Sequence, residues 1–123
     1  MILRSGIDLI EPARFENMKP EIRERFLNRV FTTAEQQLCG DNAQRLAGRF
    51  ACKEAVSKAL GTGFGKVHWT DVEILSGIEG EPILILHGEA KRIAEETGLA
   101  LWSVSITHIK EAAAAIATAM SEP

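Results

Sequence analysis

The first half of the chain combines one strand pattern with several helical ones. Residues 2–10, ILRSGIDLI, read as a strand, and Pro12 stands where a proline can begin a helix, in the segment 11–18. Apolar positions recur at helical spacing in 20–30 and again in a long segment from about 44 to 60. We therefore predict one strand followed by helices.

Local signals set the ends of two helices. Thr32 and Glu35 form a capping box, in which the threonine hydroxyl accepts one backbone N–H and the glutamate accepts another, so a short helix is expected through Leu38. Gly61 follows the long helix and can take the left-handed conformation that ends helices at little cost.

The second half changes to an alternating pattern. Its predicted elements are strands at 67–75 and 82–88 joined by the turn-rich SGIEGE, a helix at 89–98 and a strand at 99–107. The alanine-rich segment 110–120, KEAAAAIATAM, presents a conflict, because its propensity is helical but it follows a strand with no helix cap between them. The pattern alone does not decide between helix and strand for this segment.

Composition is that of a single globular domain. The 123 residues, 46% hydrophobic and 25% charged, suffice for one core, so residues 1–123 are expected to form one domain. No apolar run approaches the roughly 20 residues that cross a bilayer, and the N-terminus lacks a signal-peptide pattern. We therefore expect a cytoplasmic protein without membrane contact, in which Cys39 and Cys52 are free structural thiols.

Charge is unevenly distributed along the chain. Residues 44–66 hold five cations against one carboxylate, whereas residues 67–123 hold three cations against nine carboxylates. A local cationic patch on a chain of net charge −3 favours a small anionic ligand over nucleic acid, which normally requires a basic domain. A solvated helix face is the alternative.

Two charges of the long helix fall within its apolar arc. At 100° per residue, Glu54 and Lys58 lie among apolar positions, where an unpaired charge is costly and a partner is expected. The alternative is an ordinary ion pair between residues four apart. Because Arg49, Lys53 and Ser57 follow the adjoining edge of the helix, all five polar side chains are predicted to face one cleft.

Asp8 is a second carboxylate among apolar neighbours. Either it turns to solvent, or it is paired, hydrogen-bonded or bound to a metal. Together with Glu54 and the nearby cations it would suit a Mg²⁺-bound polyphosphate.

Other motifs exclude several common kinds of active site. The glycine-rich GTGFGK follows a helix instead of preceding one, which excludes a Walker loop and a dinucleotide fingerprint. His108 ends a predicted strand, where it could be a general base, a ligand contact or a surface residue. No set of Cys and His, or of Ser, His and Asp, has the spacing of a zinc site or a hydrolase triad.

Five blocks of the sequence together carry a family pattern. They are GIDLIEPARF (6–15), RVFTTAE (29–35), LAGRFACKEAVSKALGTG (46–63), GEP (80–82) and VSITHIKEAAAA (104–115). In this order, over nearly the whole chain, they resemble the bacterial holo-[acyl-carrier-protein] synthases, which are 4′-phosphopantetheinyl transferases. The central pattern F-x-x-K-E-A-x-x-K-A-x-G is highly specific.

The resemblance implies transfer of 4′-phosphopantetheine from coenzyme A to a serine of apo acyl carrier protein, with Mg²⁺ and release of 3′,5′-ADP. It implies that Asp8 and Glu54 are metal ligands and that Lys58 holds a phosphate oxygen. The other residues assigned to the coenzyme site are Arg49, Lys53, Ser57, Gly61, Pro82 and His108, the last near the 3′-phosphate. Two alternatives remain for the general base that deprotonates the acceptor serine, a metal-bound water and a carboxylate such as Glu35.

The resemblance also implies an α+β fold of the 4′-phosphopantetheinyl transferase type. An antiparallel sheet with one long helix would form the subunit of a homotrimer, with active sites between subunits and β structure for much of 111–119. Ile109 departs from the family pattern, where a small polar residue is more usual, and Ala112–Ala115 lacks a common aromatic.

Acyl carrier proteins are strongly acidic, so an arginine-bearing helix should dock them. The candidates are Arg14, Met18, Arg23 and Arg25, and at least one of these arginines could instead belong to a solvated helix face.

Two other functions are compatible with the same residues. One is a catalytically silent coenzyme A- or nucleotide-binding protein of this fold, although the presence of every residue that the chemistry needs argues against it. The other is a metal-dependent nucleotide pyrophosphatase, which would need neither a docking helix nor a carrier protein.

Overall fold

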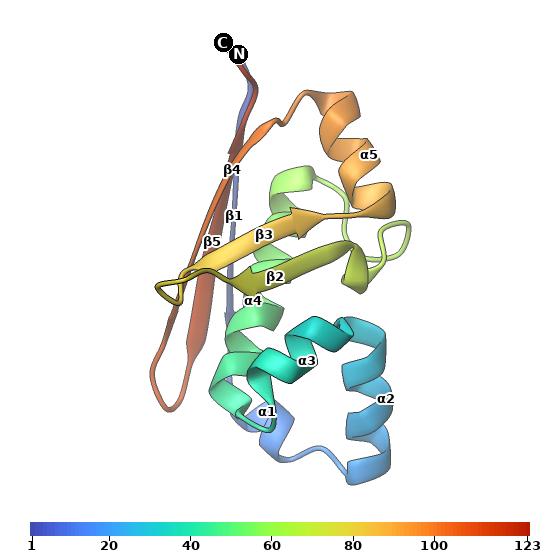
Figure 1. Ribbon diagram of the computed structural model, residues 1–123, viewed down its shortest axis with the longest axis vertical. Helices are drawn as coiled ribbons and strands as arrows, with labels where there is room; N and C mark the ends of the chain where they lie inside the picture. The colour runs from blue at the N-terminus through green and yellow to red at the C-terminus, as the bar shows by residue number, and fades with distance from the viewer.

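One long helix lies against a three-stranded antiparallel sheet in the computed structural model, which describes residues 1–123 (Figure 1). The sheet has the order β1-β5-β4, with β5 paired to both neighbours. Its strands are β1 (Leu3–Ile10), β4 (Leu101–His108) and β5 (Ala113–Met120). Because β1 and β5 run antiparallel from end to end, the two chain termini lie together at one end of the sheet (Figure 1).

The alanine-rich tail is the central strand of this sheet. Ala113, Ala115, Ala117 and Ala119 are buried on the face that α4 covers, and β5 bonds to a strand on each side. Pairing on both edges and small side chains under a helix outweigh the helical propensity of alanine. The expected β structure of 111–119 is therefore confirmed.

Helix α4 (Ala43–Leu60) packs unusually close to this sheet. The side chain of Asn42 caps it, and Gly61 ends it with a φ of 81°, as the sequence predicted. A Cβ atom at Gly6 of β1 would stand 1.9 Å from the carbonyl oxygen of Ala55, so only glycine fits there. This contact sets the distance between β1 and α4.

Three short helices cover one end of α4 (Figure 1). They are α1 (Ala13–Glu16), α2 (Pro20–Val30) and α3 (Thr33–Cys39). The capping box of Thr32 and Glu35 is present at the start of α3. An aromatic cluster of Phe15, Phe26, Phe31 and Phe50 joins these helices to α4.

A second, two-stranded sheet lies against α4 and also contacts β4 (Figure 1). It consists of β2 (Val72–Ser76) and β3 (Pro82–Leu86), followed by α5 (Gly88–Thr97). The strand expected from residue 67 is wrong up to residue 71, because the Asp71 carboxylate accepts the N–H of His68 and closes the short 3₁₀ helix η1 (Trp69–Asp71).

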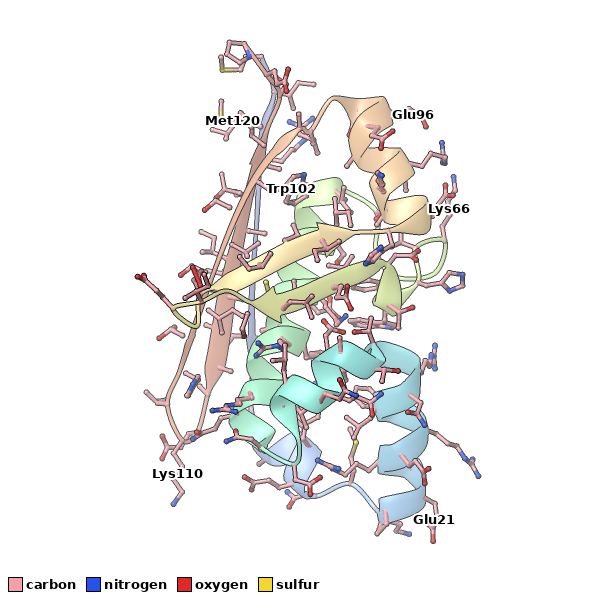
Figure 2. All side chains as sticks on the ribbon, in the orientation of Figure 1. Glu21, Lys66, Glu96, Trp102, Lys110 and Met120 are labelled. Atoms are coloured by element: carbon pink, nitrogen blue, oxygen red, sulfur yellow. The ribbon has the colours of Figure 1, made fainter.

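Charged side chains at the periphery of the molecule point outward, among them Glu21, Lys66, Glu96 and Lys110 (Figure 2). Cys39 and Cys52 are both free and buried, as expected, and burial raises the pKa of the Cys52 thiol to about 12. None of the helices combines the length and the hydropathy of a membrane-spanning segment.

Candidate active site

Asp8 lies on the face of β1 that is turned toward α4. Gly6 and Ile10 on that face are buried, whereas Ile7 and Leu9 on the other face are 65% and 71% exposed. Lys58 reaches across from α4, donating from Nζ to the carbonyl oxygen of Ile7 at 2.8 Å and approaching Oδ1 of Asp8 at 3.4 Å. The alternative in which Asp8 turns to solvent is therefore wrong.

Glu54 lies one helical turn before Lys58 on α4, close to the charged side chains of Asp8 and Lys58. Burial raises the pKa of the Glu54 carboxyl above its usual range, and the nearby Asp8 carboxylate raises it further, while Lys58 and Arg14 oppose the shift. No group of the chain donates a hydrogen bond to the Glu54 carboxylate, so its lone pairs are left for another partner. Two carboxylates that repel each other in this way favour a bound cation.

The donor set indicates which cation fits. The chain brings together no group of three or more His, Cys, Asp or Glu side chains that could enclose a metal. Zinc sites normally take three or four protein ligands, whereas Mg²⁺ is commonly held by one or two carboxylates with water and phosphate oxygens completing the shell. Asp8 and Glu54 thus fit Mg²⁺ carried with a phosphate ligand.

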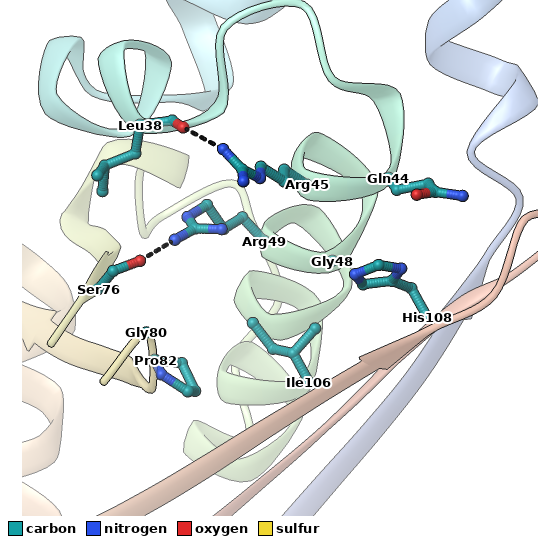
Figure 3. Close-up of a pocket in the computed structure, with 10 residues that line it drawn as sticks. All are labelled: Leu38, Gln44, Arg45, Gly48, Arg49, Ser76, Gly80, Pro82, Ile106 and His108. Carbon is teal, nitrogen blue, oxygen red and sulfur yellow. Dashed lines mark hydrogen bonds between the residues drawn. The ribbon is translucent and has the colours of Figure 1, made fainter. Parts of the chain in front are cut away.

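A cationic cavity of about 350 Å³ lies between α4, the β2–β3 hairpin and the end of β4 (Figure 3). Arg45, Arg49 and His108 line it, together with Gly80 and Pro82. Two guanidinium groups and an imidazole in one cavity suit an anion such as a phosphate. Sequence reasoning missed Arg45, although its position one helical turn before Arg49 was a usable signal.

Arg49 is held in a fixed orientation at the wall of this cavity. Its Nε donates to the carbonyl oxygen of Ile74 at 3.0 Å, and its Nη2 donates to Oγ of Ser76 at 2.7 Å (Figure 3). The remaining guanidinium N–H groups are left for a ligand. Ser76 is a further contributor that no pattern in the sequence identifies.

The two charged regions lie on opposite flanks of α4. Nine residues separate Arg49 from Lys58, which at 100° per residue places their side chains about 180° apart around the helix. Asp8 belongs to the outer strand β1 and His108 to the opposite outer strand β4. The prediction that five polar side chains of α4 face one cleft is therefore wrong. We call the Asp8, Glu54 and Lys58 region the carboxylate flank and the Arg45, Arg49 and His108 region the guanidinium flank.

Three predicted site residues are buried and committed to other contacts. Lys53 and Glu35 have fully buried side chains, with Nζ and Oε1 2.8 Å apart. Ser57 is buried as well, and its hydroxyl donates to the carbonyl oxygen of Glu54. Neither Lys53 nor Ser57 can touch the coenzyme from these positions, and Glu35 cannot reach an acceptor serine as a general base.

A model of the 4′-phosphopantetheinyl transferase superfamily matches residues 4–117. This chain belongs to that superfamily. The chain is 44% identical to the holo-[acyl-carrier-protein] synthase of Natranaerobius thermophilus over 126 residues, which cover 99% of this chain and all of the relative.

Solved structures of the superfamily have the same α+β fold. The Helicobacter pylori holo-[acyl-carrier-protein] synthase in complex with coenzyme A is 32% identical and superposes with a TM-score of 0.85, over 94% of this chain and 99% of that one. The Bacillus anthracis synthase in complex with CoA (3′,5′-ADP) is 35% identical, with a TM-score of 0.77, over 97% and 96% of the two chains. The resemblance and the fold class expected from the sequence are both confirmed.

The four docking candidates of this transferase superfamily member occupy different environments. Arg14 of α1 is exposed and lies close enough to Glu54 to lower its pKa. Met18 and Arg23 line one groove beside α2, where Arg23 also contacts Asp41 at 3.4 Å. Arg25 is exposed and, two residues after Arg23, projects from a different side of α2.

Proposed function

We propose that this chain transfers 4′-phosphopantetheine from coenzyme A to a serine of apo acyl carrier protein and releases 3′,5′-ADP, in a Mg²⁺-dependent reaction. The observation that carries the proposal is the carboxylate flank, where Asp8 lies beside Lys58 and raises the pKa of a Glu54 carboxyl that receives no hydrogen bond. The names of the relatives, holo-[acyl-carrier-protein] synthases, and the coenzyme A complexes of the structural neighbours support it.

On the carboxylate flank, Asp8 and Glu54 hold the metal. Bound Mg²⁺ neutralises charge on the pyrophosphate of the coenzyme and makes its phosphorus more susceptible to attack. Lys58 is anchored by the Ile7 carbonyl and keeps N–H groups for a phosphate oxygen, where it offsets the charge that builds on the leaving 3′,5′-ADP. Gly61 ends α4 three residues after Lys58, and a Cβ atom there would meet no other atom within 4 Å.

On the guanidinium flank, Arg49 and His108 bind the phosphate at the nucleotide end of the coenzyme. Arg49 donates from a fixed fork, which suits a phosphate better than a mobile lysine would. Arg45 adds a second cation, and Pro82 forms an apolar wall for the nucleotide.

A homotrimer brings the two flanks together, with one coenzyme bound between the carboxylate flank of one subunit and the guanidinium flank of the next. The outward face of the sheet supports assembly, because it exposes a row of apolar side chains that a monomer would leave in water. Those most exposed are Leu3, Ile7, Leu9, Leu101 and Ile116. Three subunits is the number that the family resemblance implies.

The carrier protein docks beside the carboxylate flank, so that its serine can reach the phosphate that this flank would hold. Arg14 lies next to Glu54, and Arg23 and Met18 form a groove farther along the same helical surface. A cationic edge of this kind attracts an acidic partner and orients it. Because Glu35 is buried, the other alternative for the general base is left, which would be a water on the cation that Asp8 and Glu54 would hold.

The direct test is the intact mass of an apo acyl carrier protein after incubation with this protein, coenzyme A and Mg²⁺. We expect a gain of one phosphopantetheinyl group that a chelator abolishes and added Mg²⁺ restores. Binding of coenzyme A without any mass gain on several carrier proteins would support a silent binder instead. Release of 3′,5′-ADP in the absence of carrier protein would support a pyrophosphatase.

A further inference from the structure

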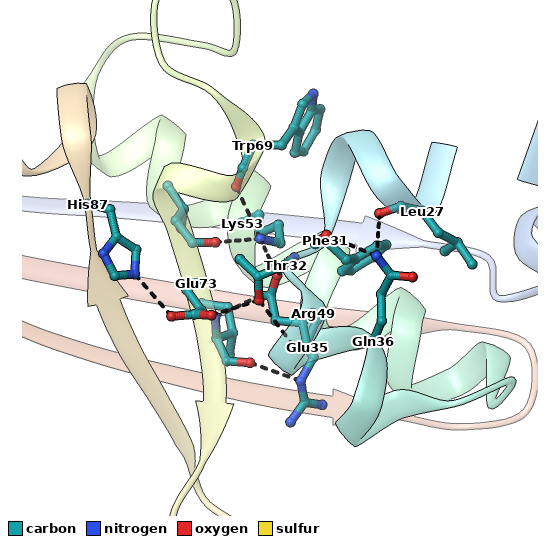
Figure 4. A network of polar contacts seen from close by, with 12 residues as sticks. Leu27, Phe31, Thr32, Glu35, Gln36, Arg49, Lys53, Trp69, Glu73 and His87 are labelled. Carbon is teal, nitrogen blue, oxygen red and sulfur yellow. Dashed lines mark hydrogen bonds and ion pairs between the residues drawn. The ribbon is translucent and has the colours of Figure 1, made fainter. Parts of the chain in front are cut away.

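Strand β2 has one edge without a strand partner. It pairs with β3 along one side only, in a two-stranded sheet. An unpaired edge leaves backbone N–H and C=O groups that must find other partners when they are buried. Here side chains of α3 and α4 provide these partners (Figure 4).

Lys53 and Glu35 occupy the first half of this edge. The Lys53 ammonium has three N–H groups, which serve Oε1 of Glu35 at 2.8 Å and the carbonyl oxygens of Val72 at 2.5 Å and Trp69 at 3.1 Å. Glu35 in turn accepts the N–H of Ile74 at 2.8 Å with its other oxygen (Figure 4). Both side chains are fully buried, so water cannot replace these bonds.

Arg49 occupies the second half of the same edge. Its Nε donates to the carbonyl oxygen of Ile74, the residue whose N–H is bonded to Glu35, and its Nη2 donates to Ser76 two residues on. The same free edge of β2 is thus held by Glu35 and Lys53 and, farther along, orients Arg49. A shift of β2 would move both acceptors of the Arg49 guanidinium together.

We infer that Glu35 and Lys53 are positioning residues for Arg49, acting through the free edge of β2, and that Ser76 completes the orientation of its guanidinium. This inference rests on the proposed function, because it takes Arg49 as a coenzyme contact. It assigns to two buried residues of the family pattern a role in coenzyme affinity without any contact to the coenzyme.

The first test compares Glu35→Gln with Glu73→Gln. Glutamine at 35 cannot accept from Ile74, Thr32 and Lys53 together, so β2 loses an anchor. Glu73 is the matched control, since it is the residue before Ile74 on β2 but bonds to Thr32 and His87, away from Arg49 (Figure 4). We expect the KM for coenzyme A to rise about fivefold in Glu35→Gln, with unchanged kcat and carrier-protein KM, and to stay unchanged in Glu73→Gln.

The second test asks whether the effect passes through Arg49. In an Arg49→Ala background, Glu35→Gln should cause no further loss of coenzyme A affinity, measured by calorimetry. A purely structural role predicts that the two losses multiply, or that kcat falls while both KM values rise, and either result would overturn the inference. Ser76→Ala should also raise the KM for coenzyme A. Ser76→Thr, which keeps the hydroxyl, should raise this KM much less.

Two further measurements keep the inference testable if Glu35→Gln does not fold or if the proposed function is wrong. If Glu35→Gln does not fold, the paired change Glu35→Gln with Lys53→Met removes both charges and carries the same expectation. Without any ligand, the Arg49 Nε proton should exchange with solvent faster in these variants than in Glu73→Gln, as followed by NMR. Equal exchange rates would refute the positioning role even in a chain that transfers no phosphopantetheine, whereas faster exchange without transferase activity would leave only the function disproved.

Discussion

Two pairs of lysine and carboxylate meet at α4, and they differ in how completely their hydrogen bonds are satisfied. Lys53 and Glu35 are fully buried, and every N–H of the lysine has an acceptor within the chain. Lys58 has a side chain 53% exposed, and it faces Asp8 beside a Glu54 carboxylate that receives no hydrogen bond. The buried pair stabilises the fold, and the unsatisfied pair is free to bind a ligand.

The comparison shows that burial of a charge does not by itself mark an active site. Burial lowers the pKa of the Lys53 ammonium, and the Glu35 carboxylate is the main influence that opposes this shift. Its donors are nevertheless already used. The spare bonding capacity of Asp8, Glu54 and Lys58 is the reason why we propose the carboxylate flank as the catalytic region.

The largest expected effect is on stability, from breaking the buried pair. Lys53→Met leaves the Glu35 carboxylate buried without a counter-charge and should lower the free energy of unfolding by about 3–5 kcal/mol. Lys58→Met, the matched change on the exposed lysine, should change it by less than about 1 kcal/mol while reducing activity. Chemical denaturation of both variants checks this, and equal losses of stability would remove the distinction between the pairs.

The next effect is on catalysis, from the unsatisfied pair. Glu54→Gln removes a metal ligand charge without changing volume and should reduce kcat about 100- to 1000-fold. Its melting temperature should be unchanged or higher, because the repulsion from Asp8 is relieved. Turnover close to that of the unmodified protein at saturating Mg²⁺ would show that Glu54 is not a metal ligand.

The smallest effect concerns the carrier protein. Arg14→Ala should raise the KM for acyl carrier protein about tenfold and leave the KM for coenzyme A unchanged, since Arg14 lies beside the carboxylate flank. Arg25→Ala serves as the control, because Arg25 is exposed and projects from a different side of α2 than Arg23. The docking assignment fails if Arg14→Ala affects both substrates equally.

Local signals predicted much of the fold. The capping box at Thr32, the glycine stop after α4 and the alternation in β4 each depend on residues close in sequence, and the structure contains all three. The β structure of the tail followed from the family resemblance, because its two strand partners, β1 and β4, are not visible in its own composition. The η1 turn was missed because it depends on one side-chain bond from Asp71.

The site was harder to predict from the sequence. A helical projection gives the direction of each side chain around the helix axis, but not which other segments of the chain it contacts. It placed Lys53 on a polar edge, but the carbonyl groups of η1 and β2 cover that edge and bury the lysine. It grouped Arg49 with Glu54, whereas β4 and the β2–β3 hairpin give Arg49 a cavity of its own. Only contacts between distant segments separate the structural pair from the functional one.

The central claim, that the two flanks of α4 complete one site only between subunits, has a direct test. Glu54→Gln and Arg49→Ala proteins, each nearly inactive alone, would be unfolded together and refolded as a mixture before assay of phosphopantetheine transfer. In a cyclic assembly, sites that combine an intact carboxylate flank with an intact guanidinium flank form at random, and roughly a quarter of the normal activity should return. Activity no greater than the sum of the two separate variants would contradict the shared site.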